Sequence, residues 1–309
     1  MKIVVTGSGG MLGSAILRSL NSREEHNAIG LTRADVDLTN RAAVEAAMKE
    51  LNPQLVIHAA AKVGGIQANI DQPIEFLNTN IEIDSNVILS SLSACVSGFI
   101  YVGSSCMYPR NHRQPLVESD ILAGELEPTN EGYALAKIVG ARLCEYVSKS
   151  RGVSYRTIIP SNLYGPGDNF DPTTSHLLAS VIKKVHEAKI SRSKSIDVWG
   201  SGEARREFTF IEDLASWLSL AVSKIEHLPQ YLNLGFGRDY SVNDYYRTAM
   251  QVIGHEAELR HDHSRPEGMR RKLMDSSLAR QVAGWNPQTD IERGIDMTYK
   301  WYLQELGQR

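Results

Sequence analysis

The stretch Lys2-Ile3-Val4-Val5-Thr6-Gly7-Ser8-Gly9-Gly10-Met11-Leu12-Gly13 decides the fold of this 309-residue chain. The apolar run predicts a buried strand, the glycines a tight turn, and the residues from Met11 onward a helix. Gly7 permits the turn, Gly10 lets a pyrophosphate approach the backbone, and Gly13 lets helix and strand pack closely. The alternative is a glycine-rich turn that binds nothing.

The same strand-then-helix pattern continues through the first half of the chain and predicts an α/β fold with a doubly wound parallel sheet. The expected strands are Lys2–Thr6, Asn27–Thr32, Leu55–Ala59, Gly98–Gly103 and Ser154–Pro160. The expected helices are Met11–Leu20, Arg41–Leu51, an amphipathic stretch around Thr79–Ser97, and Tyr133–Ser150.

The pattern changes after Tyr164-Gly165-Pro166-Gly167, where loops lengthen and polar residues scatter. We therefore expect a first domain over residues 1–165 and a smaller C-terminal lobe over 166–309. Glu207–Ser223 and a strand at Tyr231–Gly235 are expected to return to the first domain, so that residues of about 207–235 join it again.

Composition excludes several classes of protein. Apolar residues make up 42% and charged residues 22%, as in globular proteins, and the net charge of −3 favours neither nucleic acid nor membrane. The chain start resembles no signal peptide, and no apolar run spans a bilayer. Three cysteines without zinc spacing predict no metal site and a reducing cytoplasm. Cys95 and Cys144 are expected in helices, as core residues.

The end of the second strand bears on cofactor choice. Arg33 follows it, and neither Leu31 nor Thr32 is the acidic residue that would accept from a ribose 2′-hydroxyl. A cation suits a 2′-phosphate and favours NADP, although a solvated surface arginine fits the same position. Asp37-Leu38 lies where an adenine could bind.

A second constellation points to carbonyl chemistry. Tyr133 and Lys137 are four apart, so a helix places them on one face, about thirty residues after Ser104 and Cys106. A tyrosine hydroxyl needs a neighbouring cation to exchange protons near neutral pH. This predicts reduction of a carbonyl, with Cys106 adding a second chemistry. In isolation, a surface helix with a lysine lying along it fits the spacing equally well.

These features together resemble the extended short-chain dehydrogenases/reductases and, within them, the GDP-L-fucose synthase family. The resemblance rests on motifs in the family's order along nearly the whole chain: Ala60-Ala61-Lys62-Val63-Gly64-Gly65-Ile66, Gly103-Ser104-Ser105-Cys106-Met107-Tyr108-Pro109, Leu126-Glu127-Pro128-Thr129-Asn130-Glu131, Asn162–Phe170, Ser175-His176, Val198-Trp199-Gly200-Ser201-Gly202, Arg206-Glu207-Phe208 and Arg271-Lys272-Leu273-Met274-Asp275. It implies an NADP-binding Rossmann fold and a homodimer that pairs through the two helices around Thr79–Ser97 and Tyr133–Ser150.

The resemblance also implies the chemistry: NADPH-dependent 3,5-epimerisation and 4-keto reduction of a GDP-linked 4-ketosugar. Tyr133 and Ser104 would hydrogen-bond O4, and Lys137 would lower the Tyr133 pKa and hold the nicotinamide ribose. Cys106 would be the base and His176 the acid. Without the resemblance, a core cysteine and a helix-capping or surface histidine are the simpler interpretations.

The implied binding residues fall into two sets. Those for the cofactor are Gly7, Ser8, Gly9, Gly10, Met11, Leu12, Gly13, Arg33, Asp37, Leu38, Val102, Gly103, Ser104, Ser105, Lys137, Pro160, Ser161, Asn162, Leu163 and His176. Those for the GDP-sugar are Lys184, Trp199, Arg206, Glu267 and Lys272. Surface lysines and a core tryptophan are the alternatives for the second set. Three positions depart from the family pattern: Gly9 replaces a basic residue of some members, Glu267 an aspartate, and Met269-Arg270 a Thr-Pro.

Two other functions fit the sequence. A sister enzyme, such as a GDP-colitose synthase or a GDP-deoxyheptose reductase, would act on another GDP-4-ketosugar. An inactive NADP-binding sensor or scaffold would need no proton donor, so the presence of Ser104, Tyr133 and Lys137 together argues against it.

Overall fold

The computed structural model describes residues 1–172 and 174–307 and contains a six-stranded sheet in which every neighbouring pair is parallel. The strands run in the order β2 (Asn27–Leu31), β1 (Lys2–Thr6), β3 (Leu55–His58), β4 (Gly98–Val102), β5 (Ser154–Pro160) and β9 (Tyr231–Leu234). This confirms the predicted α/β fold with a doubly wound sheet. The order reverses between β1 and β3, where ligands bind in such sheets.

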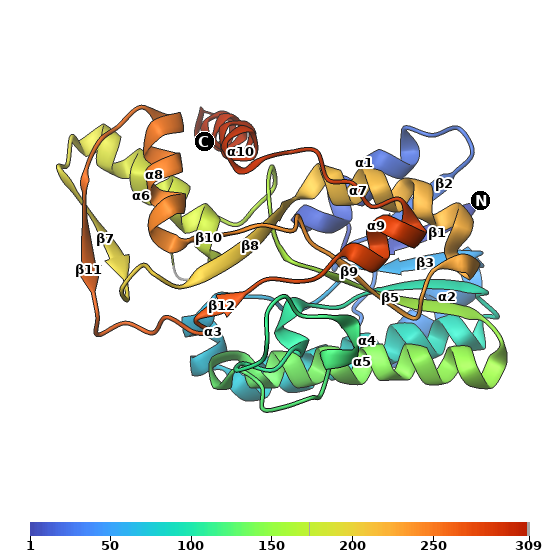
Figure 1. The fold of residues 1–309 in the computed structure, drawn as a ribbon. Coiled ribbons are helices and arrows are strands. Elements are labelled where there is room, and N and C mark those ends of the chain that lie inside the picture. The colour runs from blue at the N-terminus through green and yellow to red at the C-terminus, as the bar shows by residue number, and fades with distance from the viewer. Residues whose placement is uncertain (173, 308–309) are drawn as a thin grey trace.

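Helices cover both faces of the sheet (Figure 1). One face carries α1 (Met11–Asn21), α7 (Ile211–Ala221) and α9 (Ser277–Ala283), and the other carries α2 (Arg41–Leu51), α4 (Pro73–Ser93) and α5 (Glu131–Arg151). Strand β1 shows the reason: Ile3 and Val5 join the core beneath the first set, and Val4 joins the core beneath the second. Alternation along a strand thus supplies an apolar residue to each face.

A third core lies in the C-terminal half, between α6 (Leu177–Ser191), α8 (Val242–Ile253) and α10 (Ile291–Gly307). A small sheet joins this part, with β8 (Arg205–Phe210) pairing β10 (Asp239–Ser241), β12 (Arg271–Lys272) and β6 (Asn162–Tyr164). A two-stranded sheet of β7 (Ser195–Trp199) and β11 (Glu258–Asp262) forms its outer edge (Figure 1). The division into two domains stays a prediction, and in its second range Thr173, Gln308 and Arg309 lie outside the described residues.

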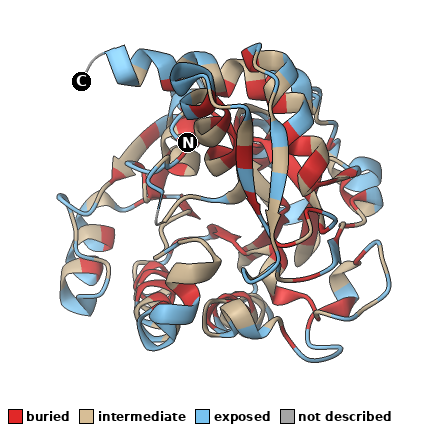
Figure 2. Ribbon diagram, turned by 90° about the vertical axis from the view of Figure 1, so that its left-hand side faces the viewer, coloured by how far each residue is buried: buried red, intermediate tan, exposed pale blue. Residues whose placement is uncertain are grey.

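Burial follows this layering. Figure 2 shows buried residues gathered on the strands and on the inner faces of the helices, with exposed residues on the outer faces. The remaining short elements are α3 (Ile66–Asp71) and the 3₁₀ turns η1 (Ser105–Met107), η2 (Glu118–Asp120), η3 (Pro128–Asn130) and η4 (Val222–His227). Two of them, η1 and η3, lie next to α5, and η1 carries the predicted site residues Ser105 and Cys106.

The structure corrects two sequence predictions. The helix expected around Thr79–Ser97 is α4, which begins at Pro73 and ends at Ser93. Proline is favoured in a first helical turn, where its missing N–H has no partner to lose. Cys95 then has a φ of 58°, which an α-helix cannot accommodate. Cys95 is therefore an exposed residue after the helix, whereas Cys144 is buried in α5 as predicted.

Candidate active site

The glycine turn forms a close contact between β1 and α1. Gly7 has a φ of 71°, and a Cβ at Gly13 would lie 2.2 Å from the carbonyl oxygen of Gly7. Any larger residue at position 13 would therefore push the turn away from the helix. Gly10 is the N-cap of α1 and brings no side chain to the first backbone N–H groups of the helix. The turn thus fits a pyrophosphate, which such N–H groups bind.

The loop after β2 contains two carboxylates, each held by hydrogen bonds from a nearby threonine. Asp35 accepts hydrogen bonds from the backbone N–H and hydroxyl of Thr32, and Asp37 accepts from both groups of Thr39. These bonds lower the pKa of each carboxyl, and Arg33 also contributes to the lowering at Asp37. Arg33 is exposed. The carbonyl oxygen of Leu38 accepts from Asn86 at 3.0 Å.

Further predicted cofactor residues lie where β4 and β5 end. Val102 is the last residue of β4, and the Gly103 N–H donates to the carbonyl of Ile158 on β5 at 2.8 Å. Pro160 ends β5, Asn162 and Leu163 begin β6, and the hydroxyls of Ser161 and Thr209 lie 2.7 Å apart. Because neighbouring parallel strands end at the same edge of the sheet, these positions face the same side as the glycine turn.

The turn after β4 presents the first reactive side chains. The Ser104 hydroxyl accepts from the N–H of Cys106 at 3.2 Å, which fixes the start of η1. Asn130, in η3, donates from Nδ2 to the Cys106 sulfur at 3.1 Å. Lys272, in β12, places its Nζ 3.6 Å from the same sulfur. The thiol is therefore half-buried and contacts one amide and one cation.

Tyr133 and Lys137 both lie in α5, one helical turn apart, but their environments differ from the expectation. Burial and the nearby charges of Cys106 and Asp84 raise the pKa of Tyr133, while a hydrogen bond from Ser104 lowers it. The lowering of this pKa by Lys137 stays a prediction. In this structure Lys137 directs its ammonium to Asp84, with Nζ 3.5 Å from Oδ1.

His176 lies directly before α6, as the N-cap residue. Its side chain is open to solvent, yet the surrounding protein desolvates it enough to lower the pKa of the imidazole. The preceding residues pack against the Gly64-Gly65 turn: the Gly65 N–H donates to the carbonyl of Thr174 at 3.2 Å. This contact joins the segment that carries His176 to the loop after β3.

The predicted sugar-nucleotide residues form two groups. In the first, Lys184 and Arg265 both lie against the Trp199 ring, with Nζ 5.9 Å and the guanidinium carbon 5.0 Å from its centre. Trp199 is 41% exposed, so it is not a core residue. Partial burial lowers the pKa of Lys184, although the nearby carboxylates of Asp197 and Glu187 act to raise it. An exposed aromatic ring in contact with two cations suits a base or a phosphate.

In the second group, strand pairing sets Lys272 of β12 beside Arg206 of β8. Arg206 donates to the carbonyl oxygens of Met269 at 2.5 Å and Glu267 at 2.9 Å, which holds the loop before β12 in place. The Glu267 carboxylate accepts from the backbone N–H of Ser201. Glu267 and Arg206 therefore make contacts that hold the loop before β12 against β8 and the turn at Ser201.

Sequence reasoning missed three residues in contact with the predicted ones: Asp84, Asn130 and Arg265. Asn130 belongs to a quoted motif, so its position next to Cys106 could have been suspected. Asp84 is separated from Lys137 by more than fifty residues, and no local pattern connects the two. Nowhere in residues 1–172 and 174–307 do three or more His, Cys, Asp or Glu side chains gather as a metal site requires.

The family assignment follows from comparison with known proteins. The model of the NAD dependent epimerase/dehydratase family matches residues 3–235. The chain belongs to this family. A GDP-L-fucose synthase from Azorhizobium caulinodans is 45% identical over 98% of this chain and 96% of its own length. A GDP-L-colitose synthase from Yersinia pseudotuberculosis is 40% identical over 99% of both chains.

A solved structure extends the similarity. The GDP-mannoheptose C4 reductase of Campylobacter jejuni, with NADP bound, is 31% identical and covers 98% of each chain with a TM-score of 0.87. These matches confirm the predicted resemblance to GDP-L-fucose synthases within the larger family. They also include proteins named for other GDP-sugars, so similarity alone does not identify the sugar.

Proposed function

We propose that this enzyme converts GDP-4-keto-6-deoxy-D-mannose to GDP-L-fucose by 3,5-epimerisation followed by NADPH-dependent reduction at C4. The observation that carries the proposal is that groups suited to reduction and a group suited to epimerisation lie close together. The turn that holds Ser104 against Tyr133 also presents the Cys106 thiol, two residues further on. The first pair can bind a ketone oxygen, and the thiol can act on the carbons beside that ketone.

The hydrogens at C3 and C5 are acidic because their carbanions delocalise onto O4. In each epimerisation, Cys106 would take the proton from one face, and His176 would return a proton to the opposite face. Hydrogen bonds from Tyr133 and Ser104 would stabilise the negative charge that develops on O4. Asn130 and Lys272 would hold the Cys106 sulfur toward the sugar, since both contact it.

Reduction would use the same oxygen site. NADPH, when bound, supplies a hydride to C4. Tyr133 then donates its proton to O4, and Lys137 orients the nicotinamide ribose. The raised pKa of Tyr133 keeps the phenol protonated, as a general acid requires. A sensor or scaffold would gain nothing from this proton donor.

The glycine turn Gly7–Gly13 would hold the cofactor pyrophosphate, Arg33 the 2′-phosphate, and the ends of β4 and β5 the nicotinamide half. Lys184, Trp199 and Arg206 would bind the guanosine diphosphate. Glu267 and Lys272 complete that set on the side of the sugar. The contacts of the exposed Trp199 ring with Lys184 and Arg265 support this assignment.

We further propose a cytoplasmic homodimer. The three cysteines are free thiols, which suits a reducing compartment, and no described helix is long and apolar enough to cross a bilayer. Exposed apolar side chains line α5 at helical spacing: Leu135, Val139 and Tyr146. Since α4 packs against α5, a second copy could cover this stripe through a four-helix contact.

The test is product identification. The protein would be incubated with NADPH and either GDP-4-keto-6-deoxymannose or the 4-ketosugar precursor of GDP-L-colitose, and kcat/KM compared between the two. GDP-L-fucose from the first substrate at the higher kcat/KM supports the proposal. A preference for the second would assign the chain to the colitose branch, and reduction without epimerisation would assign it to the heptose-reductase type.

A further inference from the structure

A polar row crosses the middle of the central sheet at its carboxyl edge. Thr6 is the last residue of β1, His58 the last of β3, and Tyr101 the fourth of the five residues of β4. Strand pairing sets Thr6 opposite His58 and His58 opposite Tyr101. Side chains paired in this way in a parallel sheet lie on the same face. All three are fully buried.

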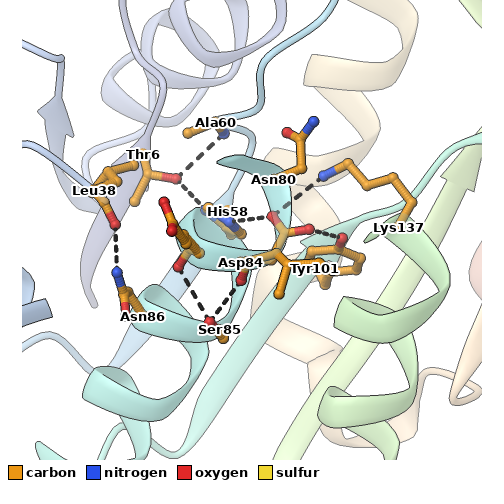
Figure 3. A network of polar contacts seen from close by, with 12 residues as sticks. Thr6, Leu38, His58, Ala60, Asn80, Asp84, Ser85, Asn86, Tyr101 and Lys137 are labelled. Carbon is orange, nitrogen blue, oxygen red and sulfur yellow. Dashed lines mark hydrogen bonds and ion pairs between the residues drawn. The ribbon is translucent and has the colours of Figure 1, made fainter. Parts of the chain in front are cut away.

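Asp84 reaches this row from α4. Its carboxylate lies between three partners (Figure 3): His58 Nε2 is 3.0 Å from Oδ1, Lys137 Nζ is 3.5 Å from Oδ1, and the Tyr101 hydroxyl donates to Oδ2. Asp84 is 1% exposed and Lys137 2% exposed. The ammonium also lies 4.7 Å from the centre of the Tyr101 ring.

The contacts define the charges within this cluster. Burial lowers the pKa of His58 despite the neighbouring carboxylate, so its ring is neutral. Burial also raises the pKa of Tyr101. For Asp84, burial alone would raise the pKa, but Lys137, His58 and Tyr101 outweigh it and lower it. The cluster therefore holds one negative and one positive charge.

The hydrogen-bond directions follow. A neutral His58 that donates from Nε2 to Asp84 has an acceptor at Nδ1, and the Thr6 hydroxyl lies 2.6 Å from it. We assign this tautomer from the network. Thr6 directly precedes Gly7, and its oxygen in turn accepts from the Ala60 N–H at 3.4 Å. The Asp84 oxygen that Lys137 contacts is thus also held by His58, whose own position is fixed by Thr6.

We propose that Asp84 is a positioning residue for the reduction, whose buried carboxylate holds the Lys137 ammonium and, through His58 and Thr6, ties it to the strand that carries the glycine turn. This inference rests on the proposed function, because Lys137 matters only if Tyr133 and a nicotinamide ribose are its partners in catalysis. Asp84 itself touches neither reacting atom.

The proposal has a consequence for pH dependence. The titratable groups around Asp84 are His58 on β3, Tyr101 on β4, and Lys137, Tyr133 and Cys144 on α5. Burial raises the pKa of Tyr133 most, and the negative charge of Asp84 adds to this. Removing that charge would let Tyr133 ionise at lower pH, and it would leave the ammonium without its counter-charge. Through both changes, the variant would lose the protonated forms of Tyr133 and Lys137 at a lower pH than the wild type does.

The decisive experiment compares Asp84→Asn with Tyr101→Phe. Tyr101→Phe removes one of the three contacts of the carboxylate and keeps its charge, whereas Asp84→Asn keeps the shape of the side chain and removes the charge. We expect Asp84→Asn to lower kcat for reduction about tenfold to a hundredfold and to move the alkaline limb of its pH profile down by about 1–3 units. We expect Tyr101→Phe to keep the wild-type limb, and Asp84→Glu to restore it. An unshifted limb in Asp84→Asn, or equal shifts in both variants, would overturn the proposal.

A double variant covers the case in which Asp84→Asn does not fold. An unpaired buried charge is strongly destabilising, whereas removing both partners together is tolerated far better. The Asp84→Asn/Lys137→Met pair should therefore melt above either single variant, and additive losses would contradict a direct partnership. Melting and NADPH affinity do not depend on the sugar. If the wild type shows no turnover, the proposed function is refuted. The role of Asp84 can still be tested in that case, because weaker NADPH binding by Asp84→Asn would support it without any sugar substrate.

Discussion

Replacing Arg33 by alanine tests how the enzyme chooses its cofactor. A charge-assisted contact to a 2′-phosphate is worth about 1.5–3 kcal/mol. The structure places the expected value at the lower end, because Arg33 is exposed and the carboxylate of Asp37 lies close enough to interact with it. A loss of about 1.5 kcal/mol corresponds to about tenfold weaker NADPH binding. NADH lacks the phosphate, so its affinity should change less than about twofold.

The assay is a fluorescence titration of wild type and Arg33→Ala with each reduced cofactor. Arg151→Ala is a matched control, since Arg151 is also exposed but ends α5, more than four helical turns from Tyr133. The difference between wild type and Arg33→Ala should shrink in 1 M salt, where exposed charges are screened within about 3 Å. An equal loss for both cofactors would show that Arg33 does not recognise the phosphate.

Three further predictions concern catalysis and assembly. Cys106→Ser should abolish solvent-deuterium uptake at C3 and C5 while reduction continues, because a serine hydroxyl is too weak a base; wild-type uptake in this variant would remove Cys106 from its role. Tyr133→Phe should lower reduction by several orders of magnitude with NADPH still bound, and a loss below about tenfold would exclude it as the proton donor. Light scattering should give a dimer for wild type and a monomer for Val139→Glu, whose charge would enter the proposed contact; a monomeric wild type at micromolar concentration would refute the dimer.

The sequence predicts the central sheet well because each strand is a short apolar run with a clear boundary. Strands β1 and β5 and helix α2 have the expected bounds. Gly7 ends β1, and such a local signal needs no knowledge of the fold. The sequence does not predict the start of α4, because only Gln72 separates Pro73 from the short helix α3 and no clear boundary divides the two helices.

The site was predictable only where its parts are local. Ser104 and Cys106 share one turn, and Tyr133 and Lys137 share one helix face, so each pair follows from spacing. The contacts between distant segments could not be read in this way. Lys272 reaches Cys106 only because β12 pairs with β8, and this pairing involves two residues on each strand.

The buried charges at Asp84 and Lys137 have no explanation in stability alone. Removing a carboxylate and an ammonium from water costs several kcal/mol for each ion, and a well-packed apolar pair of the same volume is often at least as stable. The cost is acceptable for Lys137 if its charge is needed beside Tyr133. Asp84 is then the least disruptive way to keep that charge buried, because its carboxylate oxygens also accept hydrogen bonds from His58 and Tyr101. A carboxylate so fully occupied cannot follow the lysine if it moves, and this fixes the position from which Lys137 acts.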